Sequence, residues 1–281
     1  MIAPPSFLRE FVERALAEDI GHGDATTLAL FDQPVPAGAR VSARHETVMA
    51  GGPVAALVFT VLDPRASVEL HAAEGSIVPP TSPLLTIHGD GRTILAGERV
   101  ALNILQRLCG IAALTRVFVD ATRGFPARIV DTRKTPAGWR RLDKYAVRCG
   151  GGHNHRFGLD DGLLIKDTHL ALAGGISSAV SRATAAARHG LKVEVEVQSL
   201  DEAREALDCG ADVLLLDNMP LDAIRATVAL VKDRAQIEVS GGVTLDMVRD
   251  IAALGVQMIS VGALTHSAPP ADLHLETWPS P

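Results

Sequence analysis

Cationic residues gather in one part of this sequence, between positions 131 and 169, and their types and spacing are suited to chemistry. They lie in three segments: Asp131-Thr-Arg-Lys-Thr135, Arg148-Cys-Gly-Gly-Gly-His-Asn-His-Arg156 and Leu164-Ile-Lys-Asp-Thr-His169. The chain as a whole has a formal net charge of -6. A local cluster of positive charge in an acidic protein predicts a site for an anionic ligand and argues against a nucleic-acid surface. A solvated basic face is the alternative interpretation.

The elements that must position these residues favour the ligand site. Apolar, strand-forming runs occur at residues 127–131, 162–167, 193–197, 213–217, 237–240 and 257–261. Helical segments alternate with them at 177–189, 200–209, 221–233 and 245–254, the second with Ser199 and Glu202 at capping-box spacing and the third opened by Pro220. This alternation predicts βαβ units and a parallel sheet. The number of repeats and their short loops favour a TIM-like barrel over an open doubly wound sheet. No G-x-G-x-x-G follows the first strand to indicate a dinucleotide fold. Six strands would leave such a barrel incomplete. In such barrels the chemistry lies at the carboxyl ends of the strands, and here each strand end carries a polar residue or glycine.

Carboxylates stand on two neighbouring predicted strands. Glu194 and Glu196 are two residues apart, so both side chains point to one face of their strand, toward the barrel interior. An unpaired charge is costly there, so we expect either a Lys or Arg partner or a divalent metal ion. Asp217 ends the next strand. Carboxylates in this arrangement, used with a phosphorylated substrate, are typical of a Mg²⁺ site.

Glycines stand at the last two strand ends, in Ser240-Gly241-Gly242 and at Gly262. Loops in these positions of a barrel often hold a phosphate with backbone N–H groups, since a Cβ would block close approach. Simple turn glycines are the alternative.

Arginine and lysine side chains supply the remaining groups of the predicted ligand site. Arg133 and Arg156 can hold carboxylates by bidentate pairing, whereas Lys134 and Lys166 supply point charges. A ligand with two carboxylates and a pyrophosphorylated, Mg²⁺-bound sugar phosphate would use all of them. The sequence contains no Ser-His-Asp order that would indicate a covalent nucleophile. Lys166 at a strand end could instead form a Schiff base, as in barrel aldolases, although the surrounding charges favour electrostatic catalysis.

The first hundred residues predict a small α+β unit with little chemistry of its own. We expect helices at 7–17, 51–62 and 98–118, strands at 40–48, 67–71 and 84–88, and a loop at 18–27. Three scattered cysteines and the absence of a leader or an apolar run of about 18 residues predict a soluble, cytoplasmic protein.

At this point the sequence resembles the quinolinate phosphoribosyltransferase family. The motifs that carry the resemblance are DTRKT, KYAVRCGGGHNHR, LLIKDTH, EVEV, LLLDN, SGG and SVGALTHS, in this order, with GERVALNILQRLCGIA upstream. The resemblance implies an N-terminal α/β sandwich, at residues 1–110 with the returning tail 266–281, and an open α/β barrel at 111–265. It implies that quinolinate and phosphoribosyl pyrophosphate give nicotinate mononucleotide, CO₂ and pyrophosphate, with Mg²⁺, in a homodimer with shared sites.

The resemblance also implies a role for each site residue, carried over by motif. Quinolinate would be surrounded by Arg133, His155, Arg156 and Lys166, with Arg99 reaching in from the partner subunit. Lys134 would lie between quinolinate and the phosphoribosyl group, Glu196 and Asp217 would bind the ribose and Mg²⁺, and Ser240, Gly241, Gly242 and Gly262 would hold the 5-phosphate. Glu196 and Asp217 would also stabilise the oxocarbenium-like charge as pyrophosphate departs.

Four positions depart from the family pattern: Thr168, His153, the Pro136-Ala137 pair and Thr81, which replaces a turn glycine. The first three concern the rim of the pocket and bear on substrate affinity more than on identity.

A non-enzymatic binding role in metal or anion uptake is the second hypothesis. A molybdenum-transport-associated homologue shares the fold but lacks the intact Asn-His-Arg and Ile-Lys-Asp motifs.

Overall fold

The computed structural model describes residues 2–187 and 190–280, and it divides into two compact units. The first unit contains Met1–Arg116, Pro136–Gly151 and Ser267–Pro281, and the second contains Val117–Thr135 and Gly152–His266. These are groups of residues in mutual contact. The boundaries at 110 and 265, expected from the sequence for two domains, stay a prediction.

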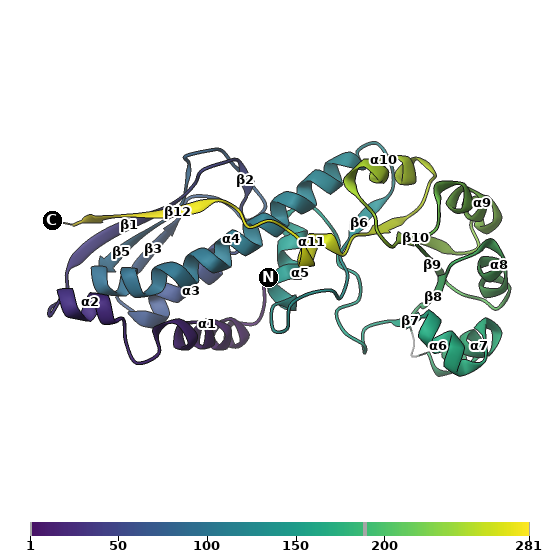
Figure 1. The fold of residues 1–281 in the computed structure, drawn as a ribbon, viewed down its shortest axis with the longest axis horizontal. Coiled ribbons are helices and arrows are strands. Elements are labelled where there is room, and N and C mark those ends of the chain that lie inside the picture. The colour runs from purple at the N-terminus through teal and green to yellow at the C-terminus, as the bar shows by residue number, and fades with distance from the viewer. Residues whose placement is uncertain (1, 188–189, 281) are drawn as a thin grey trace. The chain divides into compact units, whose positions relative to one another are not determined.

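The second unit is built on a parallel sheet of six strands in the order β6-β11-β10-β9-β8-β7 (Figure 1). The strands are β6 (Arg128–Val130), β7 (Leu163–Ile165), β8 (Val193–Val197), β9 (Val213–Asp217), β10 (Gln236–Ser240) and β11 (Met258–Ser260). The helices are α6 (Asp167–Ala173), α7 (Ile176–Ala186), α8 (Leu200–Asp208), α9 (Leu221–Val231), α10 (Leu245–Ala253) and α11 (Ala263–His266). Since β6 and β7 are the two edges, the sheet is an open barrel, which confirms the predicted α/β fold.

Helix ends in this unit follow local rules, with small differences from the predicted bounds. Ser199 caps α8, its Oγ accepting the N–H of Glu202 at 3.2 Å. The Glu202 carboxylate accepts the N–H of Gln198 and not that of the cap residue. Pro220 is the cap of α9 and not its first helical residue. The predicted helix 177–189 extends over residues 188 and 189, which lie outside the described residues.

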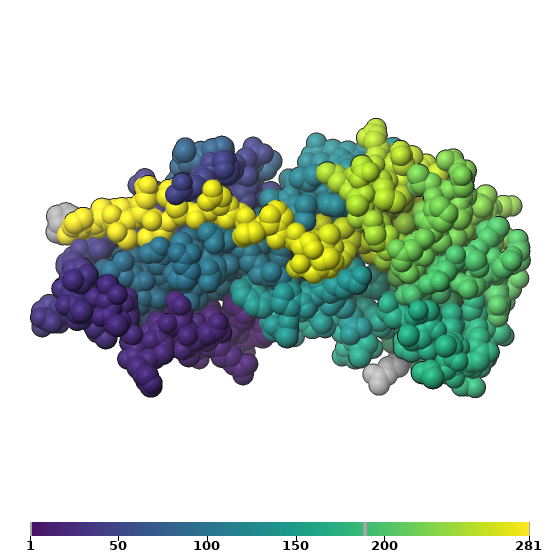
Figure 2. Space-filling view, in the orientation of Figure 1, coloured from purple at the N-terminus to yellow at the C-terminus, as the bar shows by residue number. Residues whose placement is uncertain are grey.

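The first unit is a four-stranded antiparallel sheet in the order β12-β1-β5-β3, with α3 and α4 on one face (Figure 1). The elements are β1 (Pro36–Ala43), β3 (Ser67–Leu70), β5 (Pro83–Asp90), β12 (Leu273–Pro279), the short pair β2 (Thr47–Val48) and β4 (Ile77–Val78), and helices α1 (Pro5–Ile20), α2 (Ala25–Leu30), α3 (Gly52–Leu62), α4 (Gly91–Ala121) and α5 (Arg140–Cys149). The end of α4, from Val117, belongs to the second unit. β12 pairs with β1 along its whole length, so the C-terminal segment runs along the surface of this unit, in yellow in Figure 2.

Two sequence predictions for the first unit were wrong in detail. The predicted loop 18–27 is shorter than expected, because α1 extends to Ile20 and α2 begins at Ala25, where Asp24 accepts the N–H of Thr27 and caps the helix. The predicted strand 40–48 is two strands. Helix α5, which the sequence did not predict, precedes the glycines at 150–152 and buries Leu142 and Val147.

Helix α4 is long and apolar enough to cross a membrane by length and composition alone. The sequence prediction of no such run therefore does not hold for this helix. However, 56% of its most apolar 18-residue window is buried inside the protein, as in a core helix. Gln106 on α4 donates to the carbonyl of Leu273 at 3.0 Å, which ties the helix to the start of β12.

Thr81 occupies a backbone conformation that suits glycine. Its φ is 64°, in the left-handed region that β-branched residues rarely adopt. Its N–H donates to the carbonyl of Ala43 at 2.7 Å, which holds the turn against β1. The departure noted in the sequence therefore introduces local strain in the first unit, outside the chemical site.

A single carboxylate, Glu74, joins α3 to α5 within the first unit. It accepts the N–H groups of Gly51 and Gly52 at 2.8 Å each, at the start of α3, and the hydroxyl of Tyr145 at 2.6 Å. Burial and this carboxylate raise the pKa of Tyr145, so the phenol stays protonated and donates.

We expect Glu74→Ala to lower the free energy of unfolding by about 2–4 kcal/mol, because it leaves two helix N–H groups and one hydroxyl without their charged acceptor. Tyr145→Phe, which removes only one of these bonds, should cost about 1 kcal/mol. Urea unfolding followed by circular dichroism measures both. Equal losses for the two variants would contradict the role assigned to the carboxylate.

Candidate active site

A cavity of 330 Å³ opens at the carboxyl ends of the strands in the second unit. Its lining residues come from every one of the six strand ends: Thr132, Arg133, Lys134, His155, Arg156, Leu164, Lys166, Glu196, Leu215, Asp217, Glu238, Ser240 and Ser260. Eight of the predicted site residues are in this set: Arg133, Lys134, His155, Arg156, Lys166, Glu196, Asp217 and Ser240. The polar strand ends therefore converge, as expected for a barrel.

The other four predicted site residues do not line this cavity. Gly241 and Gly242 follow Ser240 in the loop after β10, and Gly262 precedes α11. Arg99 lies on α4, in the first unit, with an exposed side chain. Its predicted contribution from a partner subunit stays a prediction.

The two arginines of the cavity form an electrostatic site for an anion. The Nε of Arg133 is buried and has no hydrogen-bond partner among the described residues. Arg156 donates through Nη1 to the carbonyl of Gly162 at 2.9 Å. Burial and the nearby charge of Arg133 lower the pKa of Arg156. Two partly buried guanidinium groups repel each other, so both are stabilised when an anion binds between them.

Lys134 is held by its backbone and leaves its side chain exposed. Its N–H donates to Thr132 Oγ1 at 3.0 Å, and its carbonyl accepts the hydroxyl of Thr265 at 2.8 Å. A Cβ on Gly262 would lie 3.1 Å from Lys134 Cδ. Glycine at position 262 therefore leaves room for the lysine side chain to pass.

Gly241 is needed for a similar steric reason. Its φ is 88°, and a Cβ there would lie 2.5 Å from the side chain of Asn218. Asn218 itself has a φ of 55°, and its Nδ2 donates to Asp217 Oδ2 at 2.9 Å. The loop after β10 thus packs on the residue that orients the Asp217 carboxylate.

Asp131 anchors the loop that carries His155. It is fully buried, and its two oxygens accept the side-chain amide of Asn154 at 2.6 Å and the backbone N–H of His155 at 2.9 Å. This function was not assigned from the sequence, which marked Asp131 only as a polar strand end.

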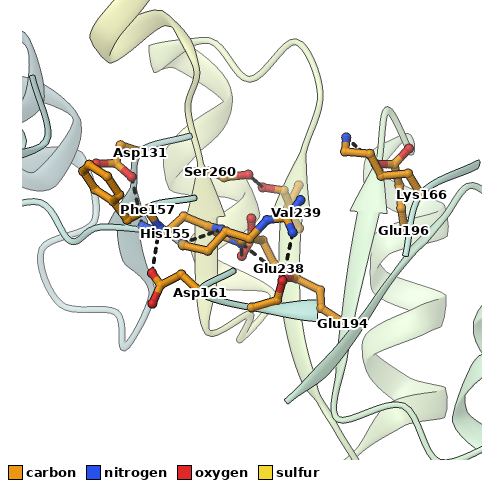
Figure 3. A network of polar contacts seen from close by, with 12 residues as sticks. Asp131, His155, Phe157, Asp161, Lys166, Glu194, Glu196, Glu238, Val239 and Ser260 are labelled. Carbon is orange, nitrogen blue, oxygen red and sulfur yellow. Dashed lines mark hydrogen bonds and ion pairs between the residues drawn. The ribbon is translucent and has the colours of Figure 1, made fainter. Parts of the chain in front are cut away.

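The carboxylates of the barrel interior pair with cations, as Figure 3 shows. Glu196 accepts a hydrogen bond from Lys166 Nζ at 3.2 Å. Glu194 and Glu238 lie 3.2 Å and 3.4 Å from His155 Nε2. Glu196 therefore has a lysine partner, one of the two kinds expected from the sequence, whereas Glu194 lies beside a histidine, which was not expected. The expected divalent metal ion stays a prediction.

Sequence reasoning missed Glu238. It precedes Ser240 by two residues, just as Glu194 precedes Glu196, so the same two-residue period could have placed it inside the barrel. Its side chain is 1% exposed. Burial of His155 opposes its protonation, but Glu194 and Glu238 outweigh this and raise the pKa of His155 to about 10.

Glu196 and Asp217 have the donor chemistry that Mg²⁺ prefers. Both carboxylates line the cavity at neighbouring strand ends, and both remain open to it. Oxygen ligands from one or two carboxylates, completed by water and substrate phosphates, are typical of Mg²⁺. The residues present therefore fit this ion.

Comparison with known proteins covers nearly the whole chain. Family models described as the N-terminal and C-terminal domains of quinolinate phosphoribosyl transferase match residues 24–109 and 111–276. A probable carboxylating nicotinate-nucleotide pyrophosphorylase of Bacillus subtilis is 40% identical over 269 residues, which is 96% of this chain and 93% of the relative.

Solved structures agree in fold as well as in sequence. The nicotinate-nucleotide pyrophosphorylase of Francisella tularensis has a TM-score of 0.92 and 35% identity, covering 98% of each chain. NadC from Streptococcus pyogenes has a TM-score of 0.94 and 36% identity, covering 99% of each chain. The chain therefore belongs to the quinolinate phosphoribosyltransferase family.

Proposed function

We propose that this protein is a pentosyltransferase that converts quinolinate and phosphoribosyl pyrophosphate to nicotinate mononucleotide, CO₂ and pyrophosphate in de novo NAD biosynthesis. Family membership across both domain models supports this reaction. The observation that carries it is the pair of arginines in the cavity. The Nε of Arg133 is buried with no hydrogen-bond partner among the described residues, and with the destabilised charge of Arg156 it is suited to a dicarboxylate.

The substrates fit the two sides of the cavity. Quinolinate would be surrounded by Arg133, His155, Arg156 and Lys166. Lys134 would lie between quinolinate and the phosphoribosyl group. The ribose and Mg²⁺ would be held by Glu196 and Asp217, and the 5-phosphate by the loops that contain Ser240, Gly241, Gly242 and Gly262. The cavity lining contains both the cations and the carboxylates that this assignment uses.

Positioning and electrostatics are the contributions of the protein. The arginines hold the two ring carboxylates so that the pyridine nitrogen faces the anomeric carbon. When bound, Mg²⁺ neutralises charge on the departing pyrophosphate. Glu196 and Asp217 stabilise the positive charge that develops on the ribose. Once the ring nitrogen is quaternised, the C2–carboxylate bond breaks, its electron pair stays on the ring carbon, and that carbon takes up a proton.

The Schiff-base alternative at Lys166 is disfavoured by its surroundings. Nζ lies 3.2 Å from the Glu196 carboxylate and forms an ion pair with it. A Schiff base requires an amine that is free to attack a carbonyl carbon. The lysine is instead arranged as the partner of this carboxylate.

We further propose a homodimer with shared sites and a cytoplasmic location. Arg99 supports the first, since its side chain is exposed on α4 and could reach a neighbouring subunit. Three free cysteines support a reducing compartment.

The activity is tested with quinolinate labelled in the 2-carboxyl group. The purified protein should release labelled CO₂ only when phosphoribosyl pyrophosphate and Mg²⁺ are both present, and chelation of Mg²⁺ with EDTA should stop the release. Added Mg²⁺ should restore it. No release at any Mg²⁺ concentration would exclude the proposed function and leave the binding role as the alternative.

A further inference from the structure

A five-residue loop, 157–161, follows Arg156 and leads through Gly162 into β7. Its two large apolar side chains, Phe157 and Leu159, are 38% and 74% exposed. Burial of apolar surface therefore does little to fix the shape of this loop. Hydrogen bonds have to do so instead.

Asp161 closes the loop with such a bond. Its Oδ2 accepts the backbone N–H of Phe157 at 2.7 Å, which joins the last residue of the loop to the first (Figure 3). Hydrogen bonds to a carboxylate are shorter and stronger than those between neutral groups. Asp161 is exposed and is not among the residues that line the cavity. Its side chain therefore serves the shape of the loop and not the cavity wall.

The loop in turn places the carbonyl group that holds Arg156. Nη1 of this arginine donates to the carbonyl of Gly162 at 2.9 Å, and within the described part of the chain this is the only hydrogen bond of the Arg156 side chain. A Cβ on Gly162 would lie 3.5 Å from Cβ and Cδ of the arginine, so the glycine also contacts its stem. At the other end, the backbone N–H of Arg156 donates to His155 Nδ1 at 2.8 Å. Because a guanidinium is a planar fork of five N–H groups, the bond to Gly162 restrains the direction in which the remaining donors face.

We propose that Asp161 is a positioning residue for the dicarboxylate: it keeps the loop closed, so that the Gly162 carbonyl holds Arg156 with its remaining donors toward a substrate carboxylate. The proposal rests on the proposed function, because it takes quinolinate as the ligand of Arg156. It gives Asp161 no contact with the substrate. The negative charge of an aspartate would by itself weaken the binding of a dianion, so the sign of the effect separates positioning from charge.

The test compares Asp161→Ala with Asp161→Asn. Asparagine retains a side-chain oxygen that can accept the N–H of Phe157, whereas alanine retains none. We expect Asp161→Ala to weaken quinolinate binding about tenfold and Asp161→Asn to weaken it no more than about twofold, because only alanine releases the loop. Isothermal titration calorimetry measures the binding. KM for phosphoribosyl pyrophosphate, from steady-state CO₂ release, should change less than about twofold in both variants, since the substitutions leave Glu196 and Asp217 in place.

Asp160 offers a matched control in the same loop. It is exposed, and its carboxylate makes no hydrogen bond or ion pair with any residue that the structure describes. Asp160→Ala removes the same charge one residue away and should leave quinolinate binding within about twofold. The midpoint of thermal unfolding should stay within about 2 °C of the unmodified protein in all three variants, because the bond to Phe157 is local and lies at the surface.

A double-mutant cycle shows whether Asp161 acts through Arg156. Arg156→Lys keeps a positive charge but loses the planar fork, and its flexible stem depends less on the Gly162 carbonyl. In this background, Asp161→Ala should weaken quinolinate binding less than about twofold, compared with about tenfold in the unmodified protein. A change confined to the overall stability of the fold would give the same loss in both backgrounds.

The opposite results would overturn the proposal. Tighter quinolinate binding in both Asp161 variants would mean that the carboxylate acts by its charge. Equal losses in Asp161→Asn and Asp161→Ala, or a similar loss in Asp160→Ala, would exclude the bond to Phe157 as the cause. A full tenfold loss in the Arg156→Lys background would exclude action through Arg156, and failure of Asp161→Ala to fold would show a role in overall stability instead. If the unmodified protein neither binds quinolinate nor releases CO₂, the proposed function itself fails. If it does both and Asp161→Ala binds normally, only the positioning role fails.

Discussion

Replacing Arg133 with alanine is expected to lower kcat/KM for quinolinate by about a thousandfold, the upper range for truncating one partner of a buried ionic contact. The residue lines the cavity, and its Nε is buried with no partner among the described residues, so a ligand carboxylate can satisfy it. Removal of this guanidinium would also leave Arg156 without the neighbouring arginine that helps to balance the two carboxylates. The loss should appear mainly in KM for quinolinate and in kcat, with a smaller change in KM for phosphoribosyl pyrophosphate. Steady-state release of labelled CO₂ measures all three.

Two matched variants separate geometry from charge and from folding. Arg133→Lys keeps the charge but loses the planar, bidentate geometry, so it should recover only part of the activity. Arg128→Ala removes an exposed arginine from the start of β6, away from the strand ends, and should behave like the unmodified protein. An Arg133→Ala protein that keeps its KM for quinolinate would show that the dicarboxylate binds elsewhere.

The parallel sheet could be predicted from the sequence because the signals for its strands are local. Apolar runs of three to five residues became the six strands, and polar residues at their ends became the cavity wall. A parallel sheet brings all its carboxyl ends to one edge, so residues far apart in the chain could be grouped without knowing their distances. Six of the predicted residues that line the cavity follow from this rule: Arg133, Lys134, Lys166, Glu196, Asp217 and Ser240. His155 and Arg156 lie in the segment between β6 and β7, and His155 was assigned by the family resemblance.

The pairings inside the barrel could not be predicted in the same way. His155 meets Glu194 and Glu238 from three different segments, and which carboxylate finds which cation depends on strand order and register. The sequence left a cation or a metal as alternatives for the same reason. Lys166 and Glu196 are likewise separated by 30 residues and meet only because β7 and β8 are neighbours.

Non-local contacts also explain the errors outside the site. Helix α5 takes part in an ion pair that the sequence could not predict. Arg107 on α4 donates to both oxygens of the fully buried Asp143 at 2.9 Å and 2.8 Å. A strongly charged stretch that precedes three glycines therefore forms a helix. Similarly, β12 finds its partner β1 more than two hundred residues earlier, which no local pattern reveals.

Each of Arg99→Ala and Lys134→Ala is expected to abolish activity, and a mixture of the two is expected to restore it in part. Lys134 lines the cavity of the second unit, whereas Arg99 is exposed on α4 in the first unit. In a dimer with shared sites, a mixed pair has one site with both residues intact and one site with neither. Random exchange makes about half of the dimers mixed, so about a quarter of all sites should be active.

The two chains are best coexpressed with different affinity tags, so that mixed dimers are purified through both tags and measured without the inactive parents. Such dimers should have about half the activity of the unmodified protein per dimer, with an unchanged KM for quinolinate, because the one active site is complete. A chain that carries both changes serves as the control: paired with an unmodified chain, it breaks one residue in each site and should give almost no activity. If the purified mixed dimers are inactive while this control is active, Arg99 and Lys134 serve the same chain, and the site is not shared.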